Sequence, residues 1–132
     1  MKNQKLAFHL IILILFLVAR VDASDQTIQT KTVTHIAIIW LKKTAASDSR
    51  DALINATKGG LKIPGVKSVQ VGSAIQSERP VVDSSYDLGV SMEFESLQAL
   101  RNYEQNPIHK KSDEDTLKPL ASKFIIYDFV NE

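Results

Sequence analysis

Two segments of the chain carry hydrophobic residues in the two-residue period of a β-strand. In Tyr86–Glu95, apolar side chains occupy every second position from Tyr86 to Phe94, and small or polar residues lie between them. Such alternation predicts a strand with one buried face. In Thr32–Leu41, mostly apolar residues occupy both sets of alternating positions. That pattern is typical of a strand covered on both faces, so a layer of structure is expected on each side of it.

Two further strands and a loop complete the predicted sheet. Lys67–Ser73 follows the turn-forming run Ile63–Val66, and Phe124–Val130 is an apolar segment close to the C-terminus. Gln76–Ser85 contains a proline and several serines, which indicates a loop.

A first helix is expected between the first two strands. Ser47 or Ser49 can cap it by accepting hydrogen bonds from the first free backbone N–H groups. It should run to about Lys58, where Gly59-Gly60 can end it in left-handed conformations.

Two more helices are expected before the last strand. Ser96 can cap the first of them, and Asn106-Pro107 fits an N-cap followed by proline at the first helical position, which predicts a second helix in a new direction. The charged run Lys110–Asp115 in that second helix is interpreted as a solvent-exposed face on which opposite charges offset each other.

The resulting order, β-α-β-β-α-α-β, predicts an α+β protein of the ferredoxin-like type with a four-stranded antiparallel sheet. Helices on one face of such a sheet leave the other face open. The first strand is apolar on both faces, with Ile36, Ile38 and Trp40 on one of them, so its open face is apolar whichever way the strand points. We therefore expect a second copy of the chain to cover the open face, giving a homodimeric α+β barrel.

Residues 1–23 have the pattern of a secretory signal peptide, with Lys2 and Lys5 before an apolar run and Val21-Asp22-Ala23 as a cleavage site. The alternative is an uncleaved N-terminal anchor. Residues 24–31 are interpreted as a flexible lead-in, and residues 32–132 as the domain. A secreted or periplasmic location follows, with no membrane attachment after cleavage.

The charge balance argues against nucleic acid as a partner. The chain has 16 basic and 15 acidic residues, and the first 23 residues contain Lys2, Lys5, Arg20 and Asp22, so the remainder carries a formal charge of about −1. The chain has no cysteine, and His35 and His109 are the only histidines after residue 23. These ligand types are too few for a structural zinc site, and neither a metal nor a cofactor is predicted.

Four segments together resemble the stress-response A/B barrel family, a family of dimeric α+β barrel domains. They are VTHIAIIWLK at 33–42, YDLGVSMEFES at 86–96, YEQNPIHKK at 103–111 and FIIYDFV at 124–130. The resemblance covers roughly the last hundred residues, the usual size of one domain. It implies the same ferredoxin-like dimeric fold.

The resemblance also implies roles for particular residues. In a plant polyketide cyclase of this family, a histidine acts as base and a tyrosine as its partner in an aldol ring closure; His109 and Tyr103 match them, and His35 matches a third pocket residue. A further pocket histidine of the cyclase corresponds to Leu88, which implies a more apolar binding site here. An imidazole with a pKa near 6.5 can accept a proton α to a carbonyl, so a small apolar carbonyl compound is the implied ligand.

The same residues fit a structural interpretation. A histidine in an apolar strand is commonly a hydrogen-bonded core residue, and Tyr103 can be a core aromatic with a bonded hydroxyl. Whether the protein is an enzyme therefore stays open. One hypothesis is a binding or stress-protection protein without a reaction, the second is a cyclase or lyase, and the third is a monooxygenase on the same barrel.

Overall fold

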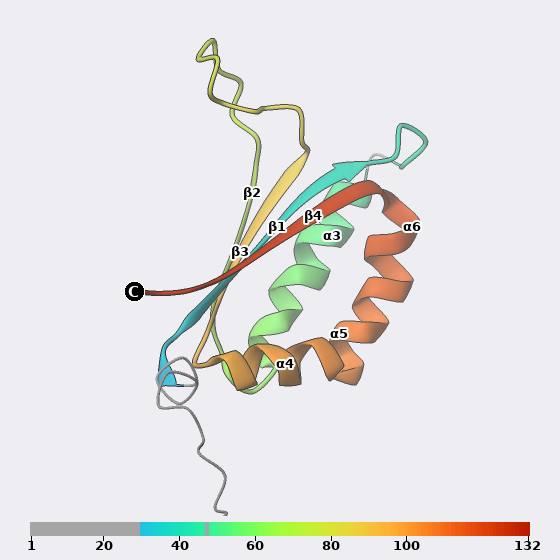
Figure 1. The fold of residues 1–132 in the computed structure, drawn as a ribbon. Helices are drawn as coiled ribbons and strands as arrows, with labels where there is room; N and C mark the ends of the chain where they lie inside the picture. The colour runs from blue at the N-terminus through green and yellow to red at the C-terminus, as the bar shows by residue number, and fades with distance from the viewer. Residues whose placement is uncertain (1–29, 47) are drawn as a thin grey trace, which may run out of the picture.

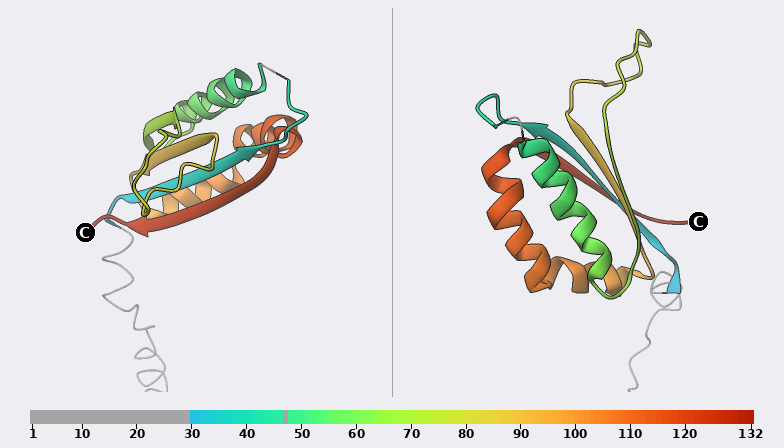
Figure 2. Two further views of the ribbon diagram at one scale, coloured as in Figure 1. Left: turned by 90° about the horizontal axis from the view of Figure 1, so that it is seen from above. Right: turned by 180° about the vertical axis from the view of Figure 1, so that it is seen from behind.

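The computed structural model describes residues 30–46 and 48–132, which form a four-stranded antiparallel sheet in the order β2-β3-β1-β4 (Figure 1). The strands are β1 Val33–Leu41, β2 Val66–Ser73, β3 Leu88–Phe94 and β4 Ala121–Val130. Figure 2 shows the helices gathered on one side of the sheet. The predicted α+β class, ferredoxin-like element order and antiparallel sheet are confirmed.

The predicted signal segment 1–23, the lead-in as far as residue 29, and Ser47 lie outside the described residues. None of the described helices has the length and hydrophobicity needed to cross a membrane.

The third strand begins two residues later than predicted, at Leu88 instead of Tyr86. The carboxylate of Asp87 accepts a hydrogen bond from the backbone N–H of Leu41 at 2.7 Å, and the Asp87 N–H donates to the carbonyl of Ile39. Asp87 thus joins β3 to the end of β1 outside the regular ladder.

The glycines after the first helix behave differently from the prediction. Helix α3 covers Ser49–Lys58 behind Asp48 as N-cap, and Gly59 keeps right-handed helical angles where a left-handed end was expected. The chain continues in a 3₁₀ turn, Gly59–Lys62. The left-handed conformation falls instead at Gly65, with φ of 86°, because the chain must turn there into β2.

The caps of the next two helices agree with the sequence prediction. Helix α4 covers Leu97–Gln105, and the Ser96 hydroxyl accepts a hydrogen bond from the N–H of Ala99 at 3.1 Å. Helix α5 covers Pro107–Ser112, and the Asn106 side chain accepts from the N–H of Ile108 at 2.9 Å. The extended backbone of Asn106 redirects the chain between the two helices.

A π-helical turn, Asp113–Leu117, separates α5 from the short helix α6, Lys118–Leu120. Its wide hydrogen bond runs from the N–H of Lys118 to the carbonyl of Asp113. Pro119 lies two residues after the turn; it has no N–H, and its ring would clash with the carbonyl four residues earlier in a regular α-helix. The wider turn accommodates this proline at the end of the helical segment.

The two faces of the sheet differ in what covers them. The helix-facing side carries the core, in which Val33, Leu88 and Phe94 are almost completely buried. On the opposite face of β4, Tyr127 and Phe129 are 54% and 48% exposed. Paired register places them beside Ile36 and Thr34 of β1, so the second face keeps apolar surface that the described part of the chain does not cover.

Candidate small-molecule pocket

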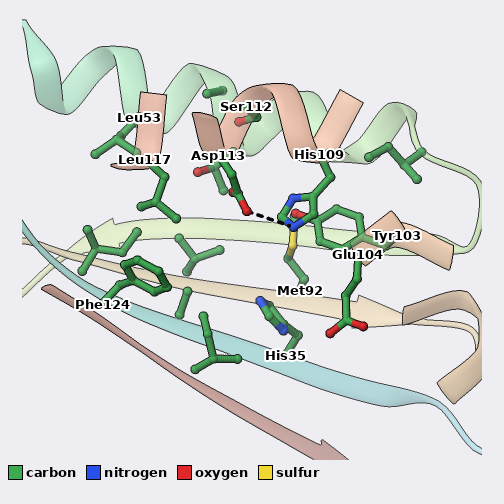
Figure 3. Close-up of a pocket in the computed structure, with 18 of the residues that line it drawn as sticks. His35, Leu53, Met92, Tyr103, Glu104, His109, Ser112, Asp113, Leu117 and Phe124 are labelled. Atoms are coloured by element: carbon green, nitrogen blue, oxygen red, sulfur yellow. Dashed lines mark ion pairs between the residues drawn. The ribbon is translucent and has the colours of Figure 1, made fainter. Parts of the chain in front are cut away.

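A cavity of about 210 Å³ lies between the helix-facing side of the sheet and the helices that cover it. Most of its wall is apolar, with Ile39 and Val90 from the sheet, Leu53 from α3, and Leu117 and Phe124 from the C-terminal segment. The polar residues gather toward one end, while Leu53, Leu117 and Phe124 mark the other (Figure 3). A cavity of this form suits a small ligand with an apolar body and a polar head group.

Tyr103, on α4, stands at the polar end and is 7% exposed. Its ring packs edge-on against Phe94, with centroids 5.0 Å apart. Tyr103 belongs to the buried core, and no residue in the described part of the chain accepts a hydrogen bond from its hydroxyl. Burial, reinforced by the negative charge of Asp113, raises the pKa of Tyr103 well above its usual value of 10.0. The phenol therefore stays neutral and can donate a hydrogen bond to a ligand.

His109, in the first turns of α5, lies directly beside Tyr103. The two ring centroids are 4.1 Å apart and the planes are inclined by 30°. The Nε2 atom of His109 lies 3.4 Å from the Oδ2 atom of Asp113 one helical turn later. Burial lowers the pKa of His109 below 6.5, an effect that Asp113 opposes. At neutral pH the imidazole is uncharged and able to accept a proton.

His35, on β1, points toward the helices and not toward the open face, which strand parity alone did not decide. Its Nδ1 atom lies 2.7 Å from the Oδ1 atom of Asp128, its register partner on β4. Its ring centroid is 6.4 Å from that of Tyr103. His35, Tyr103 and His109 thus line one cavity, each from a different element.

Leu88, expected at the binding site, does not line this cavity. It is 1% exposed and belongs to the core, opposite Ile39 of β1 and Ser73 of β2. Close packing on the same sheet face removes it from contact with the open space.

Two acidic residues at the polar end were not identified from the sequence. Asp113 belongs to the charged run interpreted as solvent-exposed, yet it lines the cavity, as does Glu104 of α4. The i,i+4 spacing from His109 to Asp113 was an available signal, because residues four apart share one helix face. Within residues 30–46 and 48–132, no group of three or more His, Cys, Asp or Glu residues could hold a metal ion.

The fold and the cavity define a ferredoxin-like α+β domain with a pocket beneath its helical layer. The profile of the stress responsive A/B barrel domain, Dabb, matches residues 33–131. This chain therefore belongs to the Dabb family. No curated protein sequence matches it.

Solved structures with the same fold include a Dabb family protein from Mesorhizobium loti, at 27% identity and a TM-score of 0.62, covering 77% of this chain and 98% of that one. A dimeric ferredoxin-like protein from Thermobifida fusca matches at 21% identity and a TM-score of 0.64, over 78% and 93% of the two chains. The hydroxynitrile lyase from Passiflora edulis matches at 18% identity and a TM-score of 0.64, over 78% and 95%.

Proposed function

We propose that this protein is an exported homodimer that binds a small, largely apolar molecule in the pocket beneath the helices of each subunit. The observation that carries the binding function is the convergence of His35, Tyr103 and His109 on one largely apolar cavity. The free hydroxyl of Tyr103 offers a donor, and a carbonyl oxygen is the simplest acceptor for it. A small apolar carbonyl compound is the proposed ligand class.

The homodimer is supported by the uncovered face of the sheet. Ile36, Ile38, Tyr127 and Phe129 lie on that face by strand parity and register, and contiguous apolar surface of this kind marks interaction sites. Structural neighbours from Bacteroides fragilis and Thermobifida fusca are described as dimeric. In the proposed dimer the open faces of two sheets pack together into one barrel.

Light scattering on residues 24–132 tests the dimer. Twice the chain mass is expected at micromolar concentration, and Tyr127→Glu should shift the population toward monomer by placing a charge at the interface. The matched control is Ile75→Glu, in the loop between β2 and β3, where Ile75 is 83% exposed. A monomer mass for the unaltered protein would refute the proposed assembly.

Pocket binding is tested by native mass spectrometry of gently purified protein, followed by release and identification of any bound molecule. Occupancy should fall in Tyr103→Phe, which keeps the ring and removes the donor. The control is Tyr127→Phe, since Tyr127 lies on the other side of the sheet. Equal occupancy in both variants would contradict a ligand at the Tyr103 hydroxyl.

A second candidate is an enzyme, a cyclase or lyase that acts on an apolar carbonyl compound. It is favoured by the uncharged state of His109 at neutral pH and by its contact with Tyr103. His109 would take a proton α to the carbonyl, and Tyr103 would donate a hydrogen bond to the enolate oxygen that forms. The Passiflora edulis neighbour, itself a hydroxynitrile lyase, supports trying this reaction class.

The two candidates predict different results for His109→Ala. An enzyme would lose turnover of an identified ligand by roughly a hundredfold or more while its stability changed little. A histidine with a purely structural role would cost about 1–3 kcal/mol of stability when removed and leave ligand binding unchanged. Melting curves and a binding assay on the same sample separate the outcomes.

Export rests on the N-terminal sequence pattern. We propose cleavage after Ala23 and release into the periplasm or the medium. N-terminal sequencing of the protein recovered from cell fractions tests it, and a start at Met1 in the membrane fraction would support the anchor alternative.

A further inference from the structure

Two carboxylates line the polar end of the pocket. They belong to Glu104 and Asp113, and Figure 3 shows Asp113 beside His109, while the Glu104 side chain extends from α4 toward the sheet. A third carboxylate, Asp128, lies behind His35 at 2.7 Å. These groups come from α4, the π-turn and β4, so their positions depend on three separate elements.

Among the residues that the structure describes, no lysine or arginine lines the cavity to balance these negative charges. The nearby Lys111 pairs with Asp115, and Lys118 pairs with Glu114, both outside the cavity wall. His109 is uncharged at neutral pH because burial lowers its pKa. An anionic head group at this end would therefore meet two carboxylates and, in the part of the chain that the structure describes, no permanent cation.

Solvent weakens this effect but does not remove it. Glu104 is exposed and the Asp113 side chain is 33% exposed, while most of the wall around them is aliphatic or aromatic, where electrostatic interactions are stronger than in water. Ionised carboxylates also only accept hydrogen bonds. A ligand head group with N–H or O–H donors can form hydrogen bonds to these carboxylates, whereas a ligand carboxylate would place like charges opposite each other.

We propose that the pocket selects an apolar molecule whose polar head is uncharged or cationic and donates hydrogen bonds as well as accepting one from Tyr103, such as a carbonyl compound of the amide type, and that it rejects carboxylic acids. Glu104 and Asp113 set this preference. The inference rests on the proposed ligand-binding function and adds the charge of the ligand to it.

Three molecules of nearly identical shape test the preference: benzamide, benzamidine and benzoate, which are neutral, cationic and anionic at pH 7.5. Binding to the purified protein is measured by calorimetry and by chemical shift changes of the Met92 methyl group, which lies in the cavity wall. Benzamide and benzamidine should bind, and benzoate should bind at least about tenfold more weakly. Raising the salt concentration should reduce the difference for benzoate, because ions screen the repulsion.

Two variants assign the preference to its residues. Glu104→Gln and Asp113→Asn each remove a charge with little change in shape. Each should reduce the difference in binding affinity between benzamide and benzoate. Glu78→Gln, an exposed carboxylate of the loop between β2 and β3, should leave this difference unchanged. Circular dichroism of each variant checks that the fold is kept.

The outcomes separate the two proposals. The charge preference alone is overturned if benzoate and benzamide bind with comparable affinity. It is also overturned if neither variant reduces the difference in affinity between them. If none of the three molecules shows saturable binding or shifts the Met92 signal, the proposed binding function fails and the preference fails with it.

Discussion

His35 and Asp128 lie opposite each other on paired strands, and their side chains meet at 2.7 Å on the helix-facing side of the sheet. The side chain of His35 is 12% exposed and that of Asp128 is 40% exposed. The bond thus joins the pocket wall on β1 to the edge strand β4, and partial exposure limits its contribution to stability.

We expect Asp128→Ala to lower the free energy of unfolding by about 1 kcal/mol. Asp128→Asn, which keeps an acceptor, should cost less. Urea unfolding of both variants, of His35→Ala and of the double variant gives the coupling energy. A coupling energy of zero would show that the contact does not stabilise the fold in solution.

Tyr103→Phe should change the free energy of unfolding by less than about 0.5 kcal/mol. The hydroxyl has no partner in the described part of the chain, and the ring contacts with Phe94 remain. Tyr103→Ala removes the ring and should cost about 3 kcal/mol or more. A large loss in Tyr103→Phe would mean that the hydroxyl is bonded after all.

Tyr103 should make the stability of the protein depend on pH in the alkaline range. Its pKa is higher in the folded protein than the unfolded value of 10.0, so the folded state binds more protons above pH 10. Stability is then lost as the pH rises beyond 10. The loss should be smaller in Tyr103→Phe; equal losses in the two proteins would assign it to other groups.

His109 should make the free energy of unfolding depend on pH in the mildly acidic range. Its folded pKa lies below the unfolded value of 6.5, so below about that pH the unfolded chain binds more protons and the free energy of unfolding falls. His109→Gln removes this contribution. His35, Glu104 and Asp113, which face His109, remain in both proteins, so the difference between the two unfolding curves isolates His109. Parallel curves between about pH 7.5 and pH 5.5 would contradict the shift.

Two glycines should respond in opposite directions to replacement by alanine. At Gly65, φ is +86° and an added Cβ would lie 2.6 Å from the Cβ of Ala99, so a loss of about 1–3 kcal/mol is expected. At Gly59, which has right-handed helical angles, an added Cβ meets nothing within 4 Å. Alanine there should stabilise by about 0.5 kcal/mol, since it restricts the unfolded chain. Thermal unfolding of the pair checks both signs.

The fold could be predicted because its signals are local. The alternation that ends at Phe94, the cap at Ser96 and the Asn106-Pro107 step each specify one element or one boundary, and the structure confirms them. The pair Gly59-Gly60 misled because glycine permits left-handed angles without requiring them. Only the turn into β2 shows that Gly65 is the residue that needs them.

The site was less predictable because side-chain direction depends on packing. His35 lies on a strand that is apolar on both faces, so its sequence pattern does not say which face meets the helices. Asp113 stands in a charged run that looks like a solvated helix face, and only its i,i+4 spacing from His109 links it to the pocket. Leu88 was assigned because it corresponds to a pocket histidine of a relative. An equivalent position in the sequence does not ensure that the side chain contacts the cavity.

The π-turn at Asp113–Leu117 has a consequence for chain length. A π-turn holds one residue more than the α-helical turn it replaces. Removing one residue there would rotate the part before the turn, with His109 and Asp113, by about 100° relative to Leu117, and would bring the Pro119 ring against the carbonyl four residues earlier. A one-codon deletion would therefore displace the polar residues of the pocket and strain the helix at the proline, whereas a substitution at the same position leaves the helical phase unchanged.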